Sequence, residues 1–340
     1  MKKVFAIVVI LLAVAGIYTA WNLLGPTVDA PDGKYFYIAT GSSYQKVKND
    51  LQQQDIISGN FFFDKLARQA KYHNNVKAGR YEIEDGMSTY NLVRMLRSGK
   101  QSPVKLVINK IRTKEDLARK IGQQFESDSI DMINFLGNND SLQSYNLDSH
   151  TVMVAVIPNT YLIYWNAPVK KIFGTLKNEQ EKFWTKERKQ KAAAKNLNIN
   201  QVYTMASIVE EETNKLKDKG LIASVYMNRI NKGMKLEADP TVKYAMRNFG
   251  LKRILYGHLR YASPYNTYQQ KGLPPGPICT PSAETIDAVL DAPETDYIFF
   301  VAKPDFNGYS NFAENYQQHL KYAKEYQTAL DELIRKKQAQ

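Results

Sequence analysis

The sequence predicts an α+β protein of 340 residues with an N-terminal transmembrane helix followed by two folded parts. An almost unbroken apolar run opens the chain, and a strand-then-helix pattern occurs three times in its first third. Longer helical patterns and one strongly apolar strand fill the second half. We therefore expect an anchor over residues 1–25, a small α/β module over 34–125 and a mixed α+β domain over 150–337.

The first residues predict a membrane anchor. Lys2 and Lys3 precede an apolar run from Val4 to Leu24, and roughly 20 apolar residues in a helix cross a bilayer. A cleaved signal peptide is the alternative, but Trp21 extends the run beyond the usual length of such a segment. The two lysines favour a cytoplasmic start. We expect a single-pass protein of the cytoplasmic (inner) membrane, with its folded parts on the periplasmic or extracytoplasmic side.

The charge balance indicates anionic surroundings. Lys and Arg total 46 against 34 Asp and Glu, which gives a formal net charge of +12. This balance favours cell wall, acidic lipid or nucleic acid as a neighbour. An outward-facing anchored protein does not meet nucleic acid, so the wall and the membrane are the expected partners. The single cysteine, Cys279, excludes an internal disulfide framework.

Three copies of one pattern predict the small module. In each copy a short strand ends in Ile, and a Ser or Thr follows five residues later, at Ser43, Ser88 and Thr113. Apolar residues recur four and eight positions further on. Because a Ser or Thr side chain can accept a hydrogen bond from a free N–H at a helix start, each copy predicts strand, turn, cap and helix. Gly99 is expected to end the second helix, and another helix is expected over 60–70.

The second half of the chain predicts the mixed α+β domain. Residues 123–149 are polar and rich in Asn, Asp and Ser, and are expected to connect the two folded parts. A basic helix anchored by Trp184 is expected over 170–195. The apolar segment 297–302 predicts a strand, and apolar residues at helical spacing predict a last helix over 315–337.

One helical pattern in this domain runs into a carboxylate. Glu212 is the next member of a helical face that is otherwise apolar and is formed by Val202, Met205, Ile208 and Val209. An acid on the buried side of a helix costs free energy unless it is paired, protonated or used in chemistry. Glu212 is therefore the first candidate for a catalytic group. The alternative is that the glutamates of this stretch form the solvated end of a surface helix.

Five motifs around Glu212 resemble those of a known family. Between Gln201 and Pro281 they are, in order, ASIVEEET, SVYMNRI, KGMKLEADPTVKYAM, YNTY and GLPPGPI. They resemble the YceG-like family, the endolytic murein (peptidoglycan) transglycosylases, and a weaker likeness covers most of the chain. The resemblance implies a YceG-like catalytic domain over 150–337 on the outer side of the membrane. It also implies a LysM-like module over 34–125, which either binds N-acetylglucosamine-containing glycans or spaces the active site from the membrane.

The resemblance implies an enzyme that cleaves MurNAc–GlcNAc bonds within nascent glycan strands, leaves 1,6-anhydroMurNAc ends and helps to terminate strand elongation. Peptidoglycan strands and peptidoglycan synthases are then the expected partners. One carboxyl protonates the departing glycosidic oxygen and next, as a base, takes the proton of the C6 hydroxyl that attacks C1. It must start protonated near neutral pH, and burial on an apolar helix face raises a carboxyl pKa in this way. Glu212 meets this demand and matches the catalytic glutamate of the family.

Three other acids are expected near the site. Glu210 also matches a family glutamate, and Asp239 is either a second carboxylate or a cap before the following proline. Glu237 either raises the pKa of Glu212 further or faces solvent. The residues expected to hold acetamido groups and to stack on sugar rings are Asn228, Tyr265, Asn266, Thr267 and Tyr268.

Two other functions stay open from the residues alone. A non-catalytic, membrane-tethered glycan-binding scaffold of the cell-wall synthesis machinery would not depend on Glu212, and a hydrolytic muramidase would release hydrated ends. No cofactor and no metal are expected. The four histidines are scattered without an H-E-x-x-H pattern, and the phosphate-loop and dinucleotide fingerprints are missing from the sequence.

Overall fold

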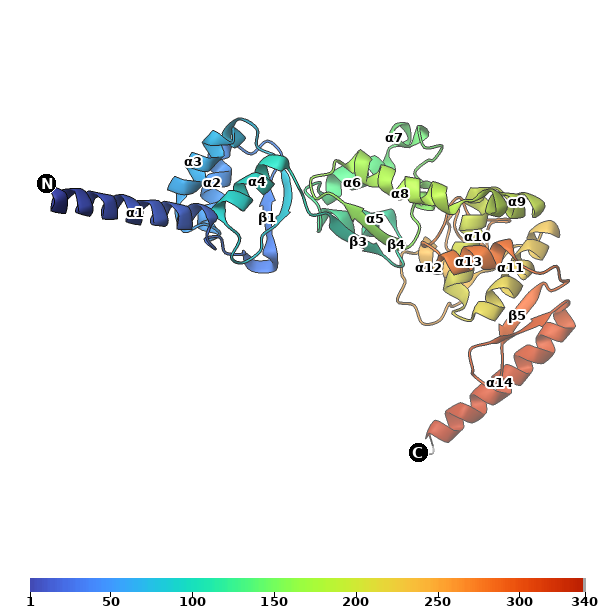
Figure 1. The fold of residues 1–340 in the computed structure, drawn as a ribbon. Coiled ribbons are helices and arrows are strands. Elements are labelled where there is room, and N and C mark those ends of the chain that lie inside the picture. The colour runs from blue at the N-terminus through green and yellow to red at the C-terminus, as the bar shows by residue number, and fades with distance from the viewer. Residues whose placement is uncertain (339–340) are drawn as a thin grey trace. The chain divides into compact units, whose positions relative to one another are not determined.

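The computed structural model describes residues 1–338 and forms two compact units (Figure 1). Unit 1 comprises residues 1–106, 122–128 and 162–168, and unit 2 comprises the rest of the described chain. The α+β class expected from the sequence is confirmed. Helices predominate, and the strands of the described residues form two-stranded sheets.

Helix α1 (Lys2–Leu24) has the length and composition of a membrane-crossing helix. The mean hydropathy of its most apolar 18-residue window is 2.5, and none of that window is buried. Among the described residues it is the one helix with these properties. A signal sequence at the start of a chain has the same properties, so the helix is compatible with both a membrane anchor and a signal.

Unit 1 encloses a core between a small sheet and three helices. Strand β1 (Tyr35–Ile38) runs antiparallel to β2 (Gly79–Glu82). The helices are α2 (Tyr44–Gln53), α3 (Asn60–Gln69) and α4 (Thr89–Ser98). Short 3-10 turns lie at Asp32–Lys34 and Tyr72–Asn74. The core is built from fully buried side chains of these elements, including Phe36, Leu51, Phe63, Tyr72, Tyr81 and Leu92.

The caps expected from the repeated pattern are confirmed. Ser43 Oγ accepts a hydrogen bond from the N–H of Lys46, and Ser88 Oγ accepts one from the N–H of Asn91, both at 3.2 Å. Gly99 ends α4 in the left-handed conformation with φ 72°, which a residue without Cβ adopts at little cost. Local capping chemistry therefore fixes where these helices begin and end.

The third copy of the pattern begins in the last residues of the first segment of unit 1 and continues in unit 2. Strand β3 (Val104–Ile108) pairs with β4 (Asn159–Ile163). Helix α5 (Lys114–Gly122) follows Thr113, whose Oγ1 accepts a hydrogen bond from the N–H of Asp116 at 3.0 Å. The third expected cap is thus also confirmed.

Residues 123–149, which were expected to connect the two folded parts, contain helices that were not predicted from the sequence. Two helices, α6 (Ser129–Gly137) and α7 (Asn139–Gln143), occupy this stretch. Because these helices are short, they bury few side chains, and the apolar signal is lost among Asn, Asp and Ser. The buried residues are Met132, Leu136 and Leu142.

The expected basic helix over 170–195 is two helices. Helix α8 (Val169–Phe183) and helix α9 (Lys186–Ala194) are separated at Trp184, which is buried. Thr185 caps α9 by accepting a hydrogen bond from the N–H of Arg188 at 3.3 Å. A Thr cap within a continuous run of charged residues is the local cause of the break.

The remaining elements of unit 2 include one central helix. They are the 3-10 turns Val152–Ala155 and His258–Arg260, α10 (Ile199–Glu212), α11 (Leu216–Asn231), α12 (Asp239–Ala245), α13 (Ala283–Leu290), β5 (Phe299–Ala302), β6 (Ser310–Ala313) and α14 (Tyr316–Gln338). Figure 1 shows α10 among α11, α12 and α13, and these three helices pack against it. Every residue from Val202 to Val209 is buried. Helix α10 is therefore a central helix, more deeply buried than the single apolar face expected from the sequence.

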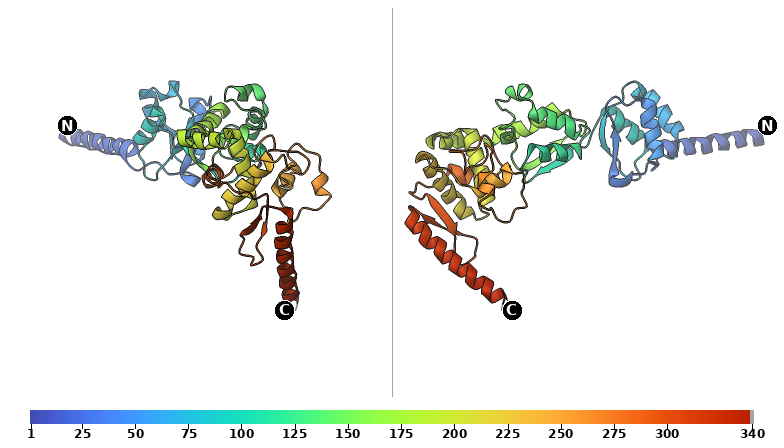
Figure 2. Two further views of the ribbon diagram at one scale, coloured as in Figure 1. Left: turned by 90° about the vertical axis from the view of Figure 1, so that its right-hand side faces the viewer. Right: turned by 180° about the vertical axis from the view of Figure 1, so that it is seen from behind.

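The strand and the last helix expected near the C-terminus are confirmed. Strand β5 runs antiparallel to β6, with Phe300 opposite Phe312. Helix α14 lies along this hairpin (Figure 2). None of the residues of α14 is buried, so one face of the helix closes over β5 and β6 while the rest stays in solvent.

Candidate active site

A cavity of about 390 Å³ lies at the C-terminal end of α10. Its walls come from the end of α10, from α11, from the segment before α12, from β5 and from α14. The lining residues are Glu212, Arg229, Leu236, Glu237, Asp239, Tyr268, Ile298, Phe299, Phe300, Tyr316 and His319. Three carboxylates, one arginine and several aromatic rings therefore meet in one concave place, a composition suited to a sugar-containing ligand.

The carboxyl of Glu212 has a raised pKa. Burial disfavours its charged form and, with the nearby negative charge of Asp239, raises its pKa from an ordinary 4.5 to about 7. The hydroxyl of Tyr226 donates a hydrogen bond to Glu212 Oε1 at 2.7 Å and opposes part of this rise. At neutral pH the group is thus divided between the acid and the carboxylate, as a group that both gives and takes a proton requires.

Tyr226 holds Glu212 from the neighbouring helix. Its side chain is 1% exposed and packs against Phe300 with the ring centroids 6.1 Å apart. Burial raises the pKa of the Tyr226 hydroxyl well above its ordinary value, so the group stays a hydrogen-bond donor. No sequence pattern indicated this contact, because Tyr226 reads as an ordinary core position of α11.

The other two carboxylates of the cavity have partners of their own. Asp239, the first residue of α12, accepts a hydrogen bond from the hydroxyl of Tyr268 at 2.7 Å. Glu237 accepts one from Nη1 of Arg229 at 3.0 Å. Arg229 also donates to the carbonyl of Ile298 at 2.7 Å. The arginine thereby ties the segment that carries Glu237 to strand β5.

Aromatic side chains from β5 and α14 form part of the cavity wall. Phe299 and His319 stack with their ring centroids 5.0 Å apart and an interplanar angle of 24°. Tyr316 lies beside both rings and is 61% exposed. Flat apolar rings at the edge of a polar cavity offer faces for the C–H side of a sugar ring. These residues were not singled out as site residues in the sequence, although the apolar strand that carries Phe299 was.

Glu210 and Glu211 point away from this cavity. Oε2 of Glu210 accepts hydrogen bonds from Thr285 and from Ser282, the latter at 3.0 Å, and lies 3.3 Å from Nζ of Lys219. Burial alone would raise the pKa of Glu210, but these donors outweigh it and the pKa is lowered. Glu210 therefore joins α10 to α11 and α13.

Glu211 is mostly buried and does not form a solvated helix end. Its side chain is 16% exposed and lies 3.2 Å from Nζ of Lys110 and 2.9 Å from Nη2 of Arg112. These two cations outweigh the effect of burial and lower the pKa of Glu211. The three consecutive glutamates thus point to three surroundings, and among them only Glu212 lines the cavity.

Of the five residues expected to bind sugar, only Tyr268 lines the cavity. Asn228 donates to the carbonyls of Thr295 and Tyr297, at 2.6 and 3.0 Å, and so fixes the segment that leads into β5. The ring of Tyr265 packs on Tyr244 with the centroids 4.8 Å apart. Both residues support the fold around the cavity rather than its surface.

Asn266 and Thr267 are buried behind Tyr268. Asn266 is 0% exposed and donates to the carbonyls of Leu259 and Tyr261, at 3.0 and 2.8 Å. The hydroxyl of Thr267 accepts from the N–H of Ala238 at 3.0 Å. These bonds hold the loop that carries Tyr268 against the start of α12, and so place Tyr268 beside Asp239.

Comparison with known proteins identifies the family. The model of the YceG-like family matches residues 36–325. A Bacillus subtilis protein named endolytic murein transglycosylase is 27% identical over 312 residues, which is 87% of this chain and 85% of that protein. A Streptococcus pneumoniae protein of the same name is 27% identical over 329 residues, which is 86% of this chain but 58% of that protein.

A solved structure agrees with the sequence comparisons. The crystal structure of a YceG-like protein from Listeria monocytogenes aligns with a TM-score of 0.56 at 27% identity. The alignment covers 85% of this chain and 99% of that one. Because the family model spans most of the chain, from β1 into α14, the protein belongs to the YceG-like family.

Proposed function

We propose that the protein is an endolytic peptidoglycan lytic transglycosylase with Glu212 as its catalytic acid and base. The observation that carries the proposal is the carboxyl of Glu212, which has a pKa of about 7 and lines a cavity with two further carboxylates and several aromatic rings. The names of the two relatives support the same reaction. The bond cleaved is the MurNAc–GlcNAc linkage within a glycan strand.

In the first step the protonated carboxyl of Glu212 gives its proton to the glycosidic oxygen as the C1–O bond breaks. The positive charge that develops at C1 is stabilised by the nearby carboxylates Asp239 and Glu237. In the second step the Glu212 carboxylate takes the proton of the C6 hydroxyl, and the C6 oxygen bonds to C1. The product is a 1,6-anhydro ring, water is not consumed, and Glu212 is again protonated.

Tyr226 and Tyr268 position the two closest acids. The hydrogen bond from Tyr226 fixes one oxygen of Glu212, so the proton is carried by the other oxygen, which is free to face the substrate. Tyr268 holds Asp239 in the same way. We propose that Glu210, in its network with Lys219, keeps the end of α10 in place and assists only indirectly.

The anchor and the N-terminal module complete the proposal. Helix α1 holds the protein in the cytoplasmic membrane as a single-pass segment within residues 1–25, and the catalytic domain over 150–337 acts on the outer side. The module over 34–125 is LysM-like and either binds the glycan strand or spaces the active site from the membrane. Anchoring beside peptidoglycan synthases would let the enzyme cut nascent strands and thereby end their elongation.

The experiment that tests the proposal compares Glu212→Gln with Glu325→Gln on un-crosslinked glycan strands. Glu325 is an exposed residue of α14 and serves as the matched control. The amide keeps the shape of the carboxyl and its bond to Tyr226 but has no acidic proton. General acid–base assistance is commonly worth about 10²–10⁴ in rate, and one group here serves both steps, so we expect a loss at or beyond the upper end. Full activity in Glu212→Gln would remove Glu212 from the mechanism, and strands left uncut by the wild-type protein would favour the glycan-binding scaffold.

A further inference from the structure

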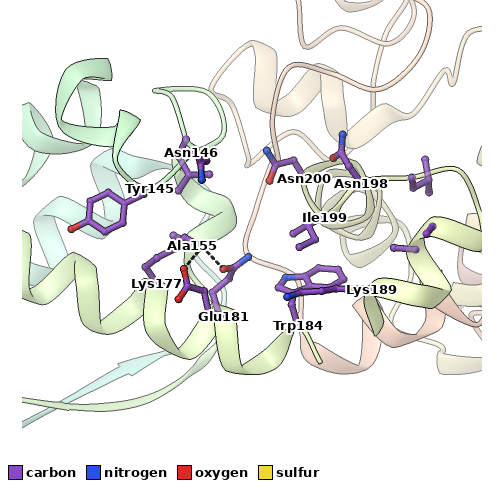
Figure 3. A pocket seen from close by; sticks show the side chains of 15 residues that line it. Tyr145, Asn146, Ala155, Lys177, Glu181, Trp184, Lys189, Asn198, Ile199 and Asn200 are labelled. Carbon is purple, nitrogen blue, oxygen red and sulfur yellow. Dashed lines mark hydrogen bonds and ion pairs between the residues drawn. The ribbon is translucent and has the colours of Figure 1, made fainter. Parts of the chain in front are cut away.

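A second cavity of about 660 Å³ lies at the opposite end of α10 from Glu212. It is enclosed by the segment before the first 3-10 turn of unit 2, by α8, by α9 and by the start of α10. Figure 3 shows Asn146, Lys177 and Glu181 on one side and Trp184, Lys189 and Asn200 on the other. The two cavities share no lining residue. Its lining residues all precede Gln201, so the family motifs around Glu212 do not include any residue of this cavity.

Trp184 supplies the first sign that this cavity has a ligand. Its side chain is 2% exposed, yet its indole N–H has no hydrogen-bond acceptor among the described residues. A buried N–H without a partner is destabilising and is uncommon in folded proteins. Trp184 lines the cavity, so a ligand oxygen would satisfy this donor after a small shift of the side chains that cover the N–H.

Two of the side-chain amides around the cavity are also unused. The amides of Asn146 and Asn200 make no hydrogen bond to any described residue, and Asn198 uses only its Oδ1, which caps α10. A primary amide both donates and accepts, so it matches the N–H and C=O groups of a peptide. The indole ring itself is covered and offers no open face on which a sugar could stack.

Two lysines and one glutamate line the cavity, so one of the lysines has no acidic partner there. Nζ of Lys177 lies 3.0 Å from Oε1 of Glu181 and donates a hydrogen bond to Oε1 of Gln180 at 2.8 Å. Lys189 forms no ion pair with any described residue. One unpaired ammonium beside a free indole N–H suits a single carboxylate.

We propose that this cavity binds the peptide carried by the glycan strand, with the free carboxylate of that peptide at Lys189 and Trp184. The inference rests on the proposed function, since it adds a second contact to the same substrate. The 14 residues of α10 separate the two cavities, which at about 1.5 Å per residue is roughly 20 Å. A strand whose sugars occupy the Glu212 cavity would reach this distance through a neighbouring peptide-bearing unit.

The binding test uses full-length protein with Glu212→Gln in detergent, so that turnover does not interfere. A stem pentapeptide alone is titrated by calorimetry, once with a free C-terminal carboxylate and once with a carboxamide. We expect the acid to bind about tenfold more tightly than the amide. Lys189→Gln is expected to abolish this difference, whereas Lys186→Gln, an exposed lysine of α9 that does not line the cavity, keeps it. Equal affinities in the parent protein, or a difference that survives Lys189→Gln, would overturn the inference.

Trp184→Phe gives an independent check, because it removes the N–H and keeps an aromatic ring. If that variant is poorly folded, Lys189→Gln still decides, since Lys189 is exposed. A second assay compares turnover of strands with and without their peptides. We expect the ratio of kcat/KM for the two strands to fall about tenfold in Lys189→Gln and to stay unchanged in Lys186→Gln. Inactivity of the parent enzyme on both strands, with peptide binding intact, would instead refute the proposed function alone.

Discussion

The raised pKa of Glu212 predicts a pH-dependent gain of stability in Glu212→Gln. A group whose folded-state pKa lies above its unfolded value stabilises the fold below the unfolded pKa, and this contribution is lost as the pH rises through the folded pKa. A rise from 4.5 to about 7 corresponds to about 3 kcal/mol at pH 8, since one pH unit is worth about 1.36 kcal/mol. The penalty is absent at pH 4 and grows between pH 4.5 and 7.

The glutamine variant carries no such penalty. The free energy of unfolding of the variant minus that of wild type should therefore be about 3 kcal/mol larger at pH 8 than at pH 4. Urea denaturation of both proteins in detergent, followed by tryptophan fluorescence, measures the two differences. Trp184 packs in the core cluster that includes α10 and so reports on this unit. Glu325→Gln is the control and should give the same difference at both pH values. A pH-independent difference for Glu212→Gln would refute the assignment of a raised pKa.

Three further predictions concern the bond from Tyr226 to Glu212, the helix caps and the membrane anchor. Tyr226→Phe removes a hydrogen bond that favours the ionised form of Glu212, so the alkaline limb of the kcat/KM profile should move upward by about one pH unit, and an unmoved limb would show that the bond has no such role. Ser43→Ala and Ser88→Ala should each lower the free energy of unfolding by about 0.5–2 kcal/mol and leave turnover per folded molecule intact; a loss of activity without a loss of stability would contradict the capping role. The protein should stay in the membrane fraction after a carbonate wash, and recovery of a soluble form that begins near Gly25 would contradict the anchor.

Local signals in the sequence predicted much of the fold. The caps at Ser43, Ser88 and Thr113 depend on residues only three positions apart, so the sequence contains all the information that they need. Stretches that bury only a few residues were harder to predict. Residues 123–149 contain two short helices that a polar composition concealed.

The candidate site, too, could be predicted from the sequence only where local spacing decides the structure. The position of Glu212 on an apolar helical face follows from the spacing of its own helix, and the structure buries that face. The hydrogen bond from Tyr226 and the stacking of Phe299 on His319 join elements that are distant in the sequence. Helical periodicity carries no information about which side chains meet across such elements.

The amides and hydroxyls that were expected to bind sugar illustrate this limit. Asn228 and Asn266 lie within motifs of the family, but their side chains bond to backbone carbonyls of their own fold. A motif records that a residue type is needed at a position and does not separate contact with substrate from support of the loop beside it. Of the five residues expected to bind sugar, only Tyr268, the last residue of the YNTY motif, lines the cavity.

The mass of the glycan ends released by the wild-type protein tests the central claim most directly. Strands without cross-links are digested, and the fragments are weighed by mass spectrometry. If Glu212 passes the proton of the C6 hydroxyl and no water takes part, every new MurNAc end is lighter by one water than the end that a hydrolase leaves. Hydrated reducing ends would contradict the account and assign the cavity, with Asp239 as its second carboxylate, to a muramidase.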